Sequence, residues 1–305
     1  MMSNESMMCD LETGVCGVSD EEEMQVINLK QEEKKITLYY ATDPICSHCW
    51  ALEPVLNRFI EEYGHYFNVE TKMGGLLASW EGFSDGANGI SKPADVAGHW
   101  REVGEHSRMP IDGSVWLENP IQSSYPPSRV FKVIERMYPG KKQAFLRVAR
   151  EAVFAMNRNI GEDDVLIELV NGLGLNGKEI VASAAQQSAQ DLLEEDFEMT
   201  ARLGVRGFPS IIIVNKEQQG IKVVGARPLE TYVQALQQIL GEAPKPKKIA
   251  TLSNKIKEGH LLFSREIEVL YDVEKDRVES FVQSELEKGT YQVRHILNEM
   301  AVQRV

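Results

Sequence analysis

Apolar and polar residues alternate along the chain in a way that predicts a folded body beginning near Ile36. A largely apolar run at 36–41 indicates a buried strand, and the apolar spacing over 47–63 indicates a helix. The segment 67–73 alternates between apolar and polar residues, which favours a second strand ending at Gly74-Gly75. A strand, a helix and a strand with this short crossover predict a parallel pair with a right-handed connection.

The next stretch, 76–126, is punctuated by glycine and proline, so we expect packed loops and a short helix there. It contains Trp80, Trp100 and Trp116, which we interpret as packing residues rather than as the lining of a groove. Large aromatic side chains in a loop-rich stretch argue against disorder, because they need a partner surface to bury their rings.

From 127 to 203 the apolar period becomes helical, and Ser188 is the expected N-cap of the last helix. The helices expected in the second half of this stretch lie at 164–173, 177–185 and 188–203. The period then changes to that of strands at 205–214 and 220–225. This predicted hairpin is followed by an amphipathic helix at 231–240, which would close a folded body spanning 36–240.

Proline and lysine in 241–248 predict a linker, and the rest of the chain, 249–305, predicts a second, smaller unit. We expect two helices there, at 264–272 and 275–288, and then a hairpin with its turn at Asn298-Glu299. Helices followed by a hairpin are typical of a winged helix. Basic and acidic residues nearly balance in this unit, which favours contact with protein over contact with DNA.

Composition and charge narrow the class of protein. The chain has 305 residues, 43% of them hydrophobic, which is enough for a sizeable core. No apolar run approaches the roughly 20 residues of a membrane helix, and the start of the chain lacks an apolar signal region. We therefore interpret the protein as cytoplasmic. Its formal net charge of −13 argues against broad binding to nucleic acid or anionic membranes.

Residues 1–35 carry nine acidic residues and three lysines, which predicts a disordered tail. This tail contains Cys9 and Cys16, two of only four cysteines in the chain. Four are too few for a disulfide scaffold, so we interpret them as catalytic, sensing or metal-binding residues. Five histidines show no spacing typical of metal ligands: His65, His99, His106, His260 and His295.

The other two cysteines lie in the sequence Asp-Pro-Ile-Cys-Ser-His-Cys-Trp at 43–50, between the first predicted strand and helix. Unpaired N–H groups and the positive end of the helix dipole favour a thiolate at such a position. In a redox centre, Cys46 on the exposed side would react as the thiolate, Cys49 would resolve the mixed disulfide, and His48 would stabilise the thiolate. The pair could also be half of a metal site, or a relic on a scaffold with another use.

The order of these features resembles the DsbA-like branch of the thioredoxin superfamily. The resemblance implies an α/β, thioredoxin-like fold with a DsbA-type helical insertion at about 76–200, here followed by the small C-terminal α+β, winged-helix-like domain. It also implies that Phe208-Pro209 forms the cis-proline loop that faces the dithiol in that family. Pro209 therefore joins Cys46, His48 and Cys49 as a redox candidate.

The motifs Asp-Pro-x-Cys at 43–46 and Met-Gly-Gly-Leu at 73–76 narrow the resemblance to cytosolic DsbA-like proteins of the FrnE type. The full layout, with a cysteine-containing tail, a DsbA-like body and a short C-terminal domain, resembles the SpxH (YjbH) family of ClpXP adapters. That resemblance implies a non-enzymatic adapter, which binds the transcriptional regulator Spx and promotes its degradation by the ClpXP protease. Such an adapter limits the response to thiol and oxidative stress.

In that family the N-terminal segment is rich in cysteine and histidine and is associated with zinc. The first histidine of this chain is His48, so the tail offers only Cys9 and Cys16 as zinc ligands. Two further ligands of a tetrahedral site would have to come from elsewhere. The alternative function is that of a cytosolic DsbA-like thiol–disulfide oxidoreductase acting through Cys46 and Cys49.

Overall fold

The computed structural model describes residues 36–86, 88–257 and 261–305. The predicted tail at 1–35, including Cys9 and Cys16, lies outside the described residues. Among the helices that are described, none has the length and apolar character needed to cross a lipid bilayer.

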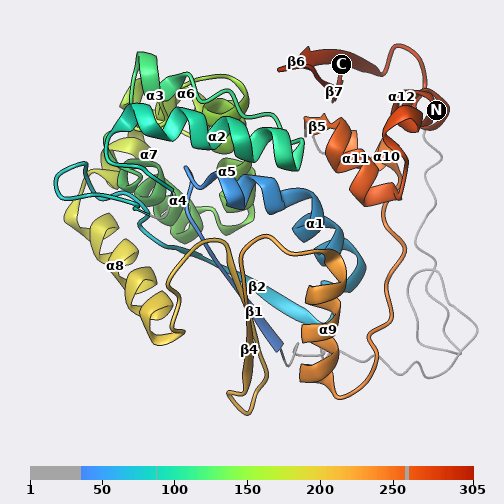
Figure 1. Ribbon diagram of the computed structural model, residues 1–305, viewed down its shortest axis with the longest axis horizontal. Helices are drawn as coiled ribbons and strands as arrows, with labels where there is room; N and C mark the ends of the chain where they lie inside the picture. Colours follow the sequence, from blue (N-terminus) through green and yellow to red (C-terminus); the bar gives the residue numbers. More distant parts are fainter. Residues whose placement is uncertain (1–35, 87, 258–260) are drawn as a thin grey trace, which may run out of the picture. The chain divides into compact units, whose positions relative to one another are not determined.

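A four-stranded sheet in the order β2-β1-β3-β4 forms the centre of the fold (Figure 1). Its strands are β1 (Ile36–Thr42), β2 (Phe67–Met73), β3 (Ser210–Val214) and β4 (Gly220–Val224). β1 and β2 pair in parallel, with Ile36 opposite Phe67, which confirms the predicted unit. β3 is antiparallel to β1, and β4 is antiparallel to β3. The sheet therefore pairs strands from the first part of the chain, β1 and β2, with strands that follow the helical insertion, β3 and β4.

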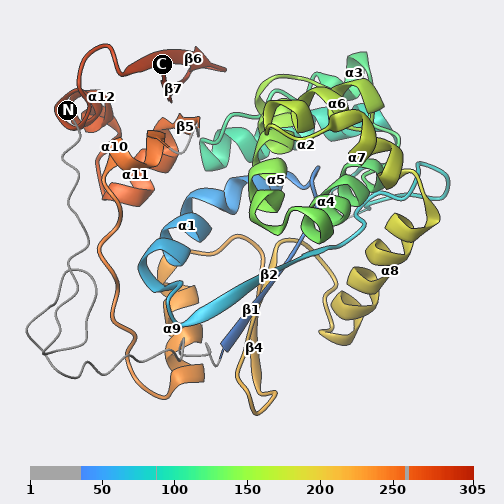
Figure 2. The ribbon, with the colours of Figure 1, turned by 180° about the vertical axis from the view of Figure 1, so that it is seen from behind.

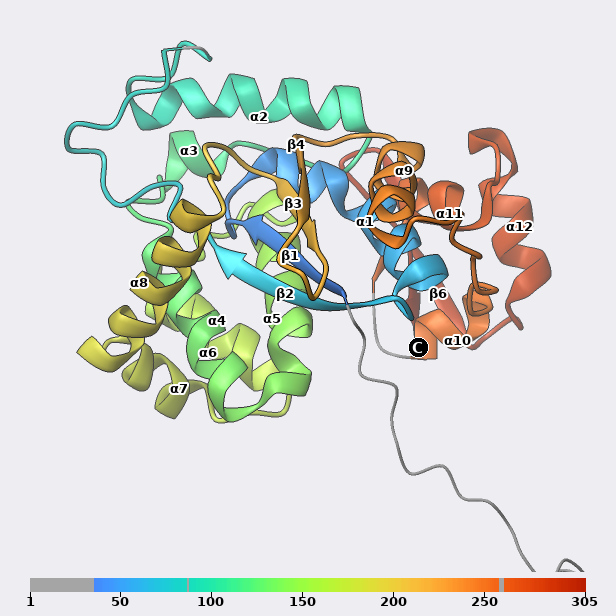
Figure 3. The same ribbon diagram turned by 90° about the horizontal axis from the view of Figure 1, so that it is seen from below.

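Two helices cover one face of this sheet, α1 (Ser47–Tyr63) and α9 (Leu229–Leu240). The bounds of α1 are those predicted from its amphipathic period. Phe59 of α1 and Tyr232 of α9 pack together with Leu38 of β1 in one apolar cluster. Figure 3 shows α9 and α8 (Gln187–Arg202) on opposite sides of the strands. The helices α1 and α9 thus cover one face of the sheet, and α8, which belongs to the insertion between β2 and β3, lies on the other side.

Between β2 and β3 the chain forms a helical insertion, in agreement with the prediction for about 76–200. Its helices are α2 (Pro93–Ser107), α3 (Val115–Glu118), α4 (Tyr125–Met137), α5 (Lys142–Arg150), α6 (Asp163–Gly172), α7 (Gly177–Ala184) and α8 (Gln187–Arg202). A 3-10 turn, Pro139–Lys141, precedes α5, and a π-helical turn, Glu151–Ala155, follows it. Ser188 is not the N-cap of α8, because this helix already begins at Gln187 after an extended Gln186.

The fifteen-residue helix α2 stands where loops and a short helix were predicted, so that prediction was wrong in this part. Its start is fixed by Pro93 and by Asp95, whose carboxylate accepts hydrogen bonds from the N–H groups of Ser91 and Lys92. Its buried face includes Trp100. Tertiary packing and a capped start outweigh the glycines that weaken the helical pattern.

The C-terminal residues form a second, three-stranded sheet in the order β5-β7-β6. Its elements are α10 (Leu252–Lys257), β5 (Leu262–Phe263), α11 (Ser264–Tyr271), a 3-10 turn (Lys275–Arg277), α12 (Val278–Glu285), β6 (Tyr291–Ile296) and β7 (Glu299–Arg304). Figure 2 shows α11 of this segment beside α1.

Two boundaries in the C-terminal segment differ from the prediction. The hairpin turn is Leu297–Asn298, both with positive φ, one residue earlier than expected. The helix α12 ends at Glu285 because the extended backbone of Leu286 directs that side chain into a small apolar core. The division into a body, a linker and a winged-helix-like domain stays a prediction.

Candidate functional site

The two thiols lie at the start of α1. Cys46 is the N-cap of this helix, and its Sγ accepts a hydrogen bond from the N–H of Cys49 at 3.2 Å. Cys46 is only 5% exposed and Cys49 is fully buried, while His48 between them is exposed. The prediction that Cys46 lies on the exposed side of the first turn was therefore wrong, because other segments cover this thiol.

Cys46 borders a pocket of about 440 Å³ between the start of α1 and the helical insertion. The apolar part of its lining is formed by Ile45, Leu76, Leu77, Trp80, Phe83, Ile90, Val96, Trp100, Trp116 and Phe208. The rings of Trp100 and Trp116 meet edge to face, with centroids 5.2 Å apart, which agrees with their interpretation as packing residues. They also line the pocket, a role that the sequence interpretation set aside.

The predicted cis-proline loop lies at the same pocket. The Phe208–Pro209 peptide bond is cis, as expected, and Phe208 shares the pocket lining with Cys46. Gly74 is needed here, because a side chain at this position would collide with the ring of Phe208. The structure thus brings together three segments far apart in the sequence, namely the dithiol, the end of β2 and the proline loop.

A pair of histidines flanks the pocket. The rings of His48 and His99 are 5.4 Å apart, and both residues contribute to the lining. Partial desolvation of the exposed His48 ring lowers its pKa, and the charges of His99 and His106 lower it further. His48 consequently carries less positive charge near neutral pH to stabilise a thiolate. The approach of His99 was missed in the sequence, because the two residues come from different helices.

Within 36–86, 88–257 and 261–305, the structure has no cluster of three histidine, cysteine or acidic side chains placed to hold a metal ion. The proposed zinc ligands, Cys9 and Cys16, are not among these residues.

Two buried charged residues lie behind the dithiol. Arg150 of α5 is 1% exposed and donates hydrogen bonds to Glu53, at 2.7 Å, and to the hydroxyl of Thr42. It also donates to the backbone carbonyl of Asp43. The Asp43 side chain is fully buried, and burial raises the pKa of its carboxyl to about 6. The sequence analysis gave neither residue a role of its own.

The surroundings shift the pKa values of the two thiols in opposite directions. Burial raises the pKa of Cys46 well above its usual value, and the contact with Cys49 adds to that shift. Burial also opposes ionisation of Cys49, but the Cys46 thiol and the positive charge of Arg150 outweigh it and lower the pKa of Cys49. The inner thiol is thus the more acidic one in this arrangement. The proposed redox roles of Cys46, His48, Cys49 and Pro209 stay predictions.

A further buried ionic network joins α1 and α5 to the C-terminal segment. Arg147 of α5 donates to both carboxylate oxygens of Glu266 in α11, and also to Glu53 and Glu151. Its guanidinium lies 4.9 Å from the ring centroid of Trp50, the residue that follows the dithiol. The carboxylates of Glu266 and Glu151 raise the pKa of Arg147 well above its usual value despite the burial.

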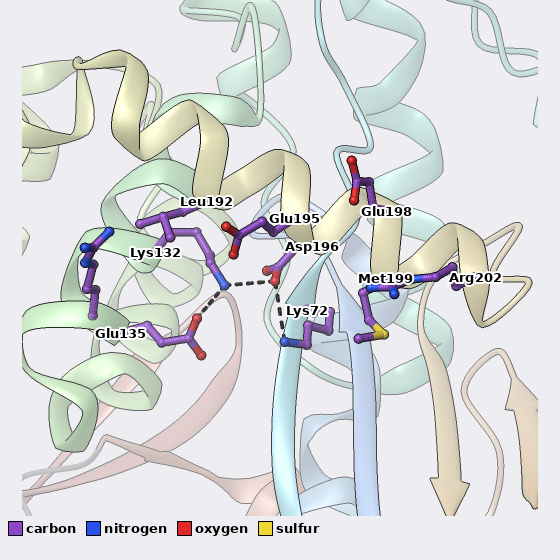
Figure 4. A pocket seen from close by; sticks show the side chains of 10 residues that line it. Lys72, Lys132, Glu135, Leu192, Glu195, Asp196, Glu198, Met199 and Arg202 are labelled. Atoms are coloured by element: carbon purple, nitrogen blue, oxygen red, sulfur yellow. Dashed lines mark hydrogen bonds and ion pairs between the residues drawn. The ribbon is translucent and has the colours of Figure 1, made fainter. Parts of the chain in front are cut away.

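A second pocket, of about 450 Å³, lies between α4 and α8 (Figure 4). At its floor the buried carboxylate of Asp196 accepts hydrogen bonds from Lys132, at 2.8 Å, and from the N–H of Met73. Lys72 and Glu135 extend this ionic network. Because the buried charges are paired and Met73 ends β2, we interpret the network as a support that fixes α8 to this strand.

Comparison with known proteins agrees with this geometry. The family model for thioredoxin matches residues 39–234. A candidate protein disulfide isomerase from Nitrosomonas europaea superimposes with a TM-score of 0.58 over 68% of this chain and 98% of its own, at 22% sequence identity. At that identity the likeness establishes the fold alone. The thioredoxin-like fold expected from the sequence is confirmed.

Two curated relatives match almost the whole chain. The ClpXP adapter protein SpxH of Halalkalibacterium halodurans is 34% identical over 274 residues, which cover 89% of this chain and 88% of the relative. The protein of the same name from Bacillus subtilis is 30% identical over 251 residues, with coverages of 81% and 82%. The 274 matched residues outnumber those of the thioredoxin match at 39–234, so the likeness is not confined to that body. The chain therefore belongs to the SpxH family of ClpXP adapter proteins.

Proposed function

We propose that this protein is an adapter that binds the transcriptional regulator Spx and promotes its degradation by the ClpXP protease. Its effect is to limit the response to thiol and oxidative stress. The observation that carries this proposal is the 34% identity, over 89% of the chain, to a protein named as a ClpXP adapter. ClpXP and its client are the partners, and the cytoplasm is the compartment in which they meet.

In this proposal the adapter is not an enzyme. It favours a state of the client in which the degradation signal is accessible, so that binding alone raises the rate of delivery. The burial of Cys46, which is 5% exposed, supports a role without a covalent step. The raised pKa of this thiol points the same way, because the thiolate is the reactive form.

A cytosolic thiol–disulfide oxidoreductase acting through Cys46 and Cys49 is the second candidate. The observation that favours it is the shared pocket of Cys46 and the cis-proline loop at Phe208. A client disulfide that entered this pocket would meet the reduced dithiol beside an apolar wall.

Replacing Cys46 and Cys49 together by alanine separates the two functions. We expect ClpXP, reconstituted from purified components, to degrade the client at a rate within about twofold of that seen with the unchanged adapter, because binding needs no thiol. The readout is the loss of full-length client over time. The same variant should lose any ability to reduce insulin disulfides, which serves as its control. A folded double variant that no longer accelerates degradation would refute the purely non-covalent adapter.

We also propose that the thiols of Cys9 and Cys16 bind zinc. Cysteine thiolates are favourable zinc ligands, and the two further ligands would come from other side chains, from water or from a second copy of the chain. Elemental analysis of the purified protein should then find zinc, and the amount should fall to background when residues 1–30 are removed. Replacing both cysteines by serine in the full chain should have the same effect. Equal zinc in all three proteins would rule out the tail as the site.

A further inference from the structure

Asp43 connects the dithiol to the wall of its pocket. One oxygen of its carboxylate accepts the N–H of Ile45, next to Cys46, at 3.0 Å. The other accepts the N–H of Leu76, at 2.8 Å, and the hydroxyl of Ser124, at 2.8 Å. Ile45, Leu76 and Ser124 belong to three separate segments, and the first two line the pocket. A single carboxylate thus fixes the dithiol turn against the end of β2 and the start of α4.

The hydroxyl of Ser124 extends this arrangement to a second residue of the wall. While it donates to Asp43, it accepts the N–H of Leu77 at 3.2 Å, and the N–H of Ser124 donates to the carbonyl of Leu77 at 2.8 Å. Leu77 is 2% exposed, so these bonds hold a buried part of the wall. Loss of the negative charge at Asp43 would weaken the whole set, because a charged acceptor makes the stronger hydrogen bonds.

The charged and titratable groups that face Asp43 come from three elements. Arg150 of α5 acts on its carboxyl, but donates to the backbone carbonyl of Asp43 rather than to the carboxylate. After the larger effect of burial, the negative charge of Asp43 contributes to the raised pKa of Tyr125 in α4. At the start of α1, burial and Cys49 raise the pKa of Cys46 and the negative charge of Asp43 raises it further, while Cys49 lies close to the backbone of Asp43. An ionised Asp43 therefore opposes a second negative charge at Cys46.

We propose that Asp43 is a positioning residue that keeps Cys46 unreactive. As a carboxylate it holds the pocket wall over Cys46 and disfavours the Cys46 thiolate. When Asp43 takes up a proton, the wall loosens and the thiolate is no longer disfavoured. This holds whether or not the dithiol takes part in client delivery. A buried carboxyl whose pKa is raised to about 6 beside a dithiol is typical of functional sites, where burial and neighbouring groups shift titration toward the working pH.

The reactivity of Cys46 tests this proposal. A pyridyl disulfide is a suitable probe, since it reacts with thiols in acid as well as at neutral pH. Cys46 attacks one sulfur of the probe and releases the first thiopyridone, and Cys49 then displaces the second as the Cys46–Cys49 disulfide forms. Two electrons pass from the dithiol to the probe, and the two thiol protons end on the two thiopyridones or in solvent. The full chain is used with Cys9 and Cys16 replaced by serine, so that only this dithiol reports.

Rates are divided by that of glutathione at the same pH, which removes the pH dependence of the probe itself. In the parent protein we expect this ratio to rise as the pH falls through about 6, where Asp43 takes up its proton. Asp43→Asn should raise the ratio at pH 7.5 by about threefold for each unit by which the thiol pKa falls. Its ratio should also show no inflection near pH 6, because no carboxyl remains.

Two further variants separate the effect of the Asp43 charge on thiol reactivity from the effects of the pocket wall and of the nearby histidines. Ser124→Ala removes one hydrogen bond to Asp43 but keeps the charge, so it should raise the ratio while the inflection remains. Asp85→Asn alters an acid that lines the same pocket without full burial, and should change the ratio less than twofold. An inflection that persists in Asp43→Asn would belong to a group other than Asp43, such as His48, and would overturn the proposal. If Asp43→Asn fails to fold, a flat ratio between pH 5 and 7.5 in the parent protein would overturn it equally.

Discussion

Replacing Arg147 by alanine should lower the free energy of unfolding by about 3–5 kcal/mol, because the substitution leaves buried carboxylates without their cation. The Arg147 side chain is 12% exposed and bonds to Glu53, Glu151 and Glu266, the last of which is 1% exposed. Equilibrium unfolding in urea, followed by circular dichroism and tryptophan fluorescence, measures the loss.

Arg158 provides the matched control for this experiment. It makes a two-pronged ion pair with Glu168, as Arg147 does with Glu266, but Glu168 is 68% exposed. Arg158→Ala should therefore cost about 1 kcal/mol or less, since solvent screens an exposed pair. Arg147→Lys should recover only part of the loss, because an ammonium group cannot reproduce the planar contacts of a guanidinium. Equal losses in Arg147→Ala and Arg158→Ala would show that the buried network contributes no special stability.

Some parts of the fold and of the site could be predicted from the sequence. The bounds of α1 and β2 follow from local periodicity and from the glycines at 64 and 74–75, so sequence alone was sufficient there. The cis peptide bond at Phe208–Pro209 was predicted from the position of this dipeptide in the family resemblance. Features that depend on neighbouring residues, or on the order of elements along the chain, can be predicted from the sequence.

Features that depend on distant segments were not predicted. Cys46 was expected to be exposed because nothing in its neighbourhood shows that the insertion returns to cover it. Arg150 bonds to Thr42 and Asp43, just before the dithiol, from more than a hundred residues away, and it has no motif of its own. The helix α2 was missed because glycine and proline punctuate the whole stretch 76–126. Within the helix, the absent side chain of Gly104 lets Ile111 approach. In each case a tertiary contact outweighs the local preference.

The same distinction applies to the C-terminal segment. The composition of 241–248 predicts a linker and therefore a separable domain beyond it. In the structure, the N–H of Lys247 donates to the carbonyl of Glu62 in α1 at 2.7 Å, and Arg58 of α1 donates to the carbonyl of Val269. Phe263 of β5 belongs to the core that includes Trp50 and the helical insertion. These contacts favour a segment that unfolds together with the body.

Phe263→Ala tests this directly and should cost about 3–5 kcal/mol, the usual loss for removing a large buried aromatic ring. The ring of Phe263 is fully buried and meets Trp50 edge to face, with centroids 5.8 Å apart. Arg147 lies over the same ring at 5.7 Å, so the substitution disturbs the ionic network as well. Trp50 packs on this ring and is one of four tryptophans, so tryptophan fluorescence and the far-ultraviolet signal should report a single, coincident transition shifted to lower urea.

Phe281→Ala is the control within the same segment. Its ring is partly buried and packs on Tyr271, at 5.2 Å, away from the body. We expect a loss of about 1–2 kcal/mol there, since only part of the ring leaves water on folding. A separable domain would behave differently: Phe263→Ala would then produce two transitions, and the later one would keep the midpoint of the unchanged protein. One shared transition means instead that the residues behind the dithiol and the C-terminal segment form one cooperative structure, so that a partner bound to either would stabilise both.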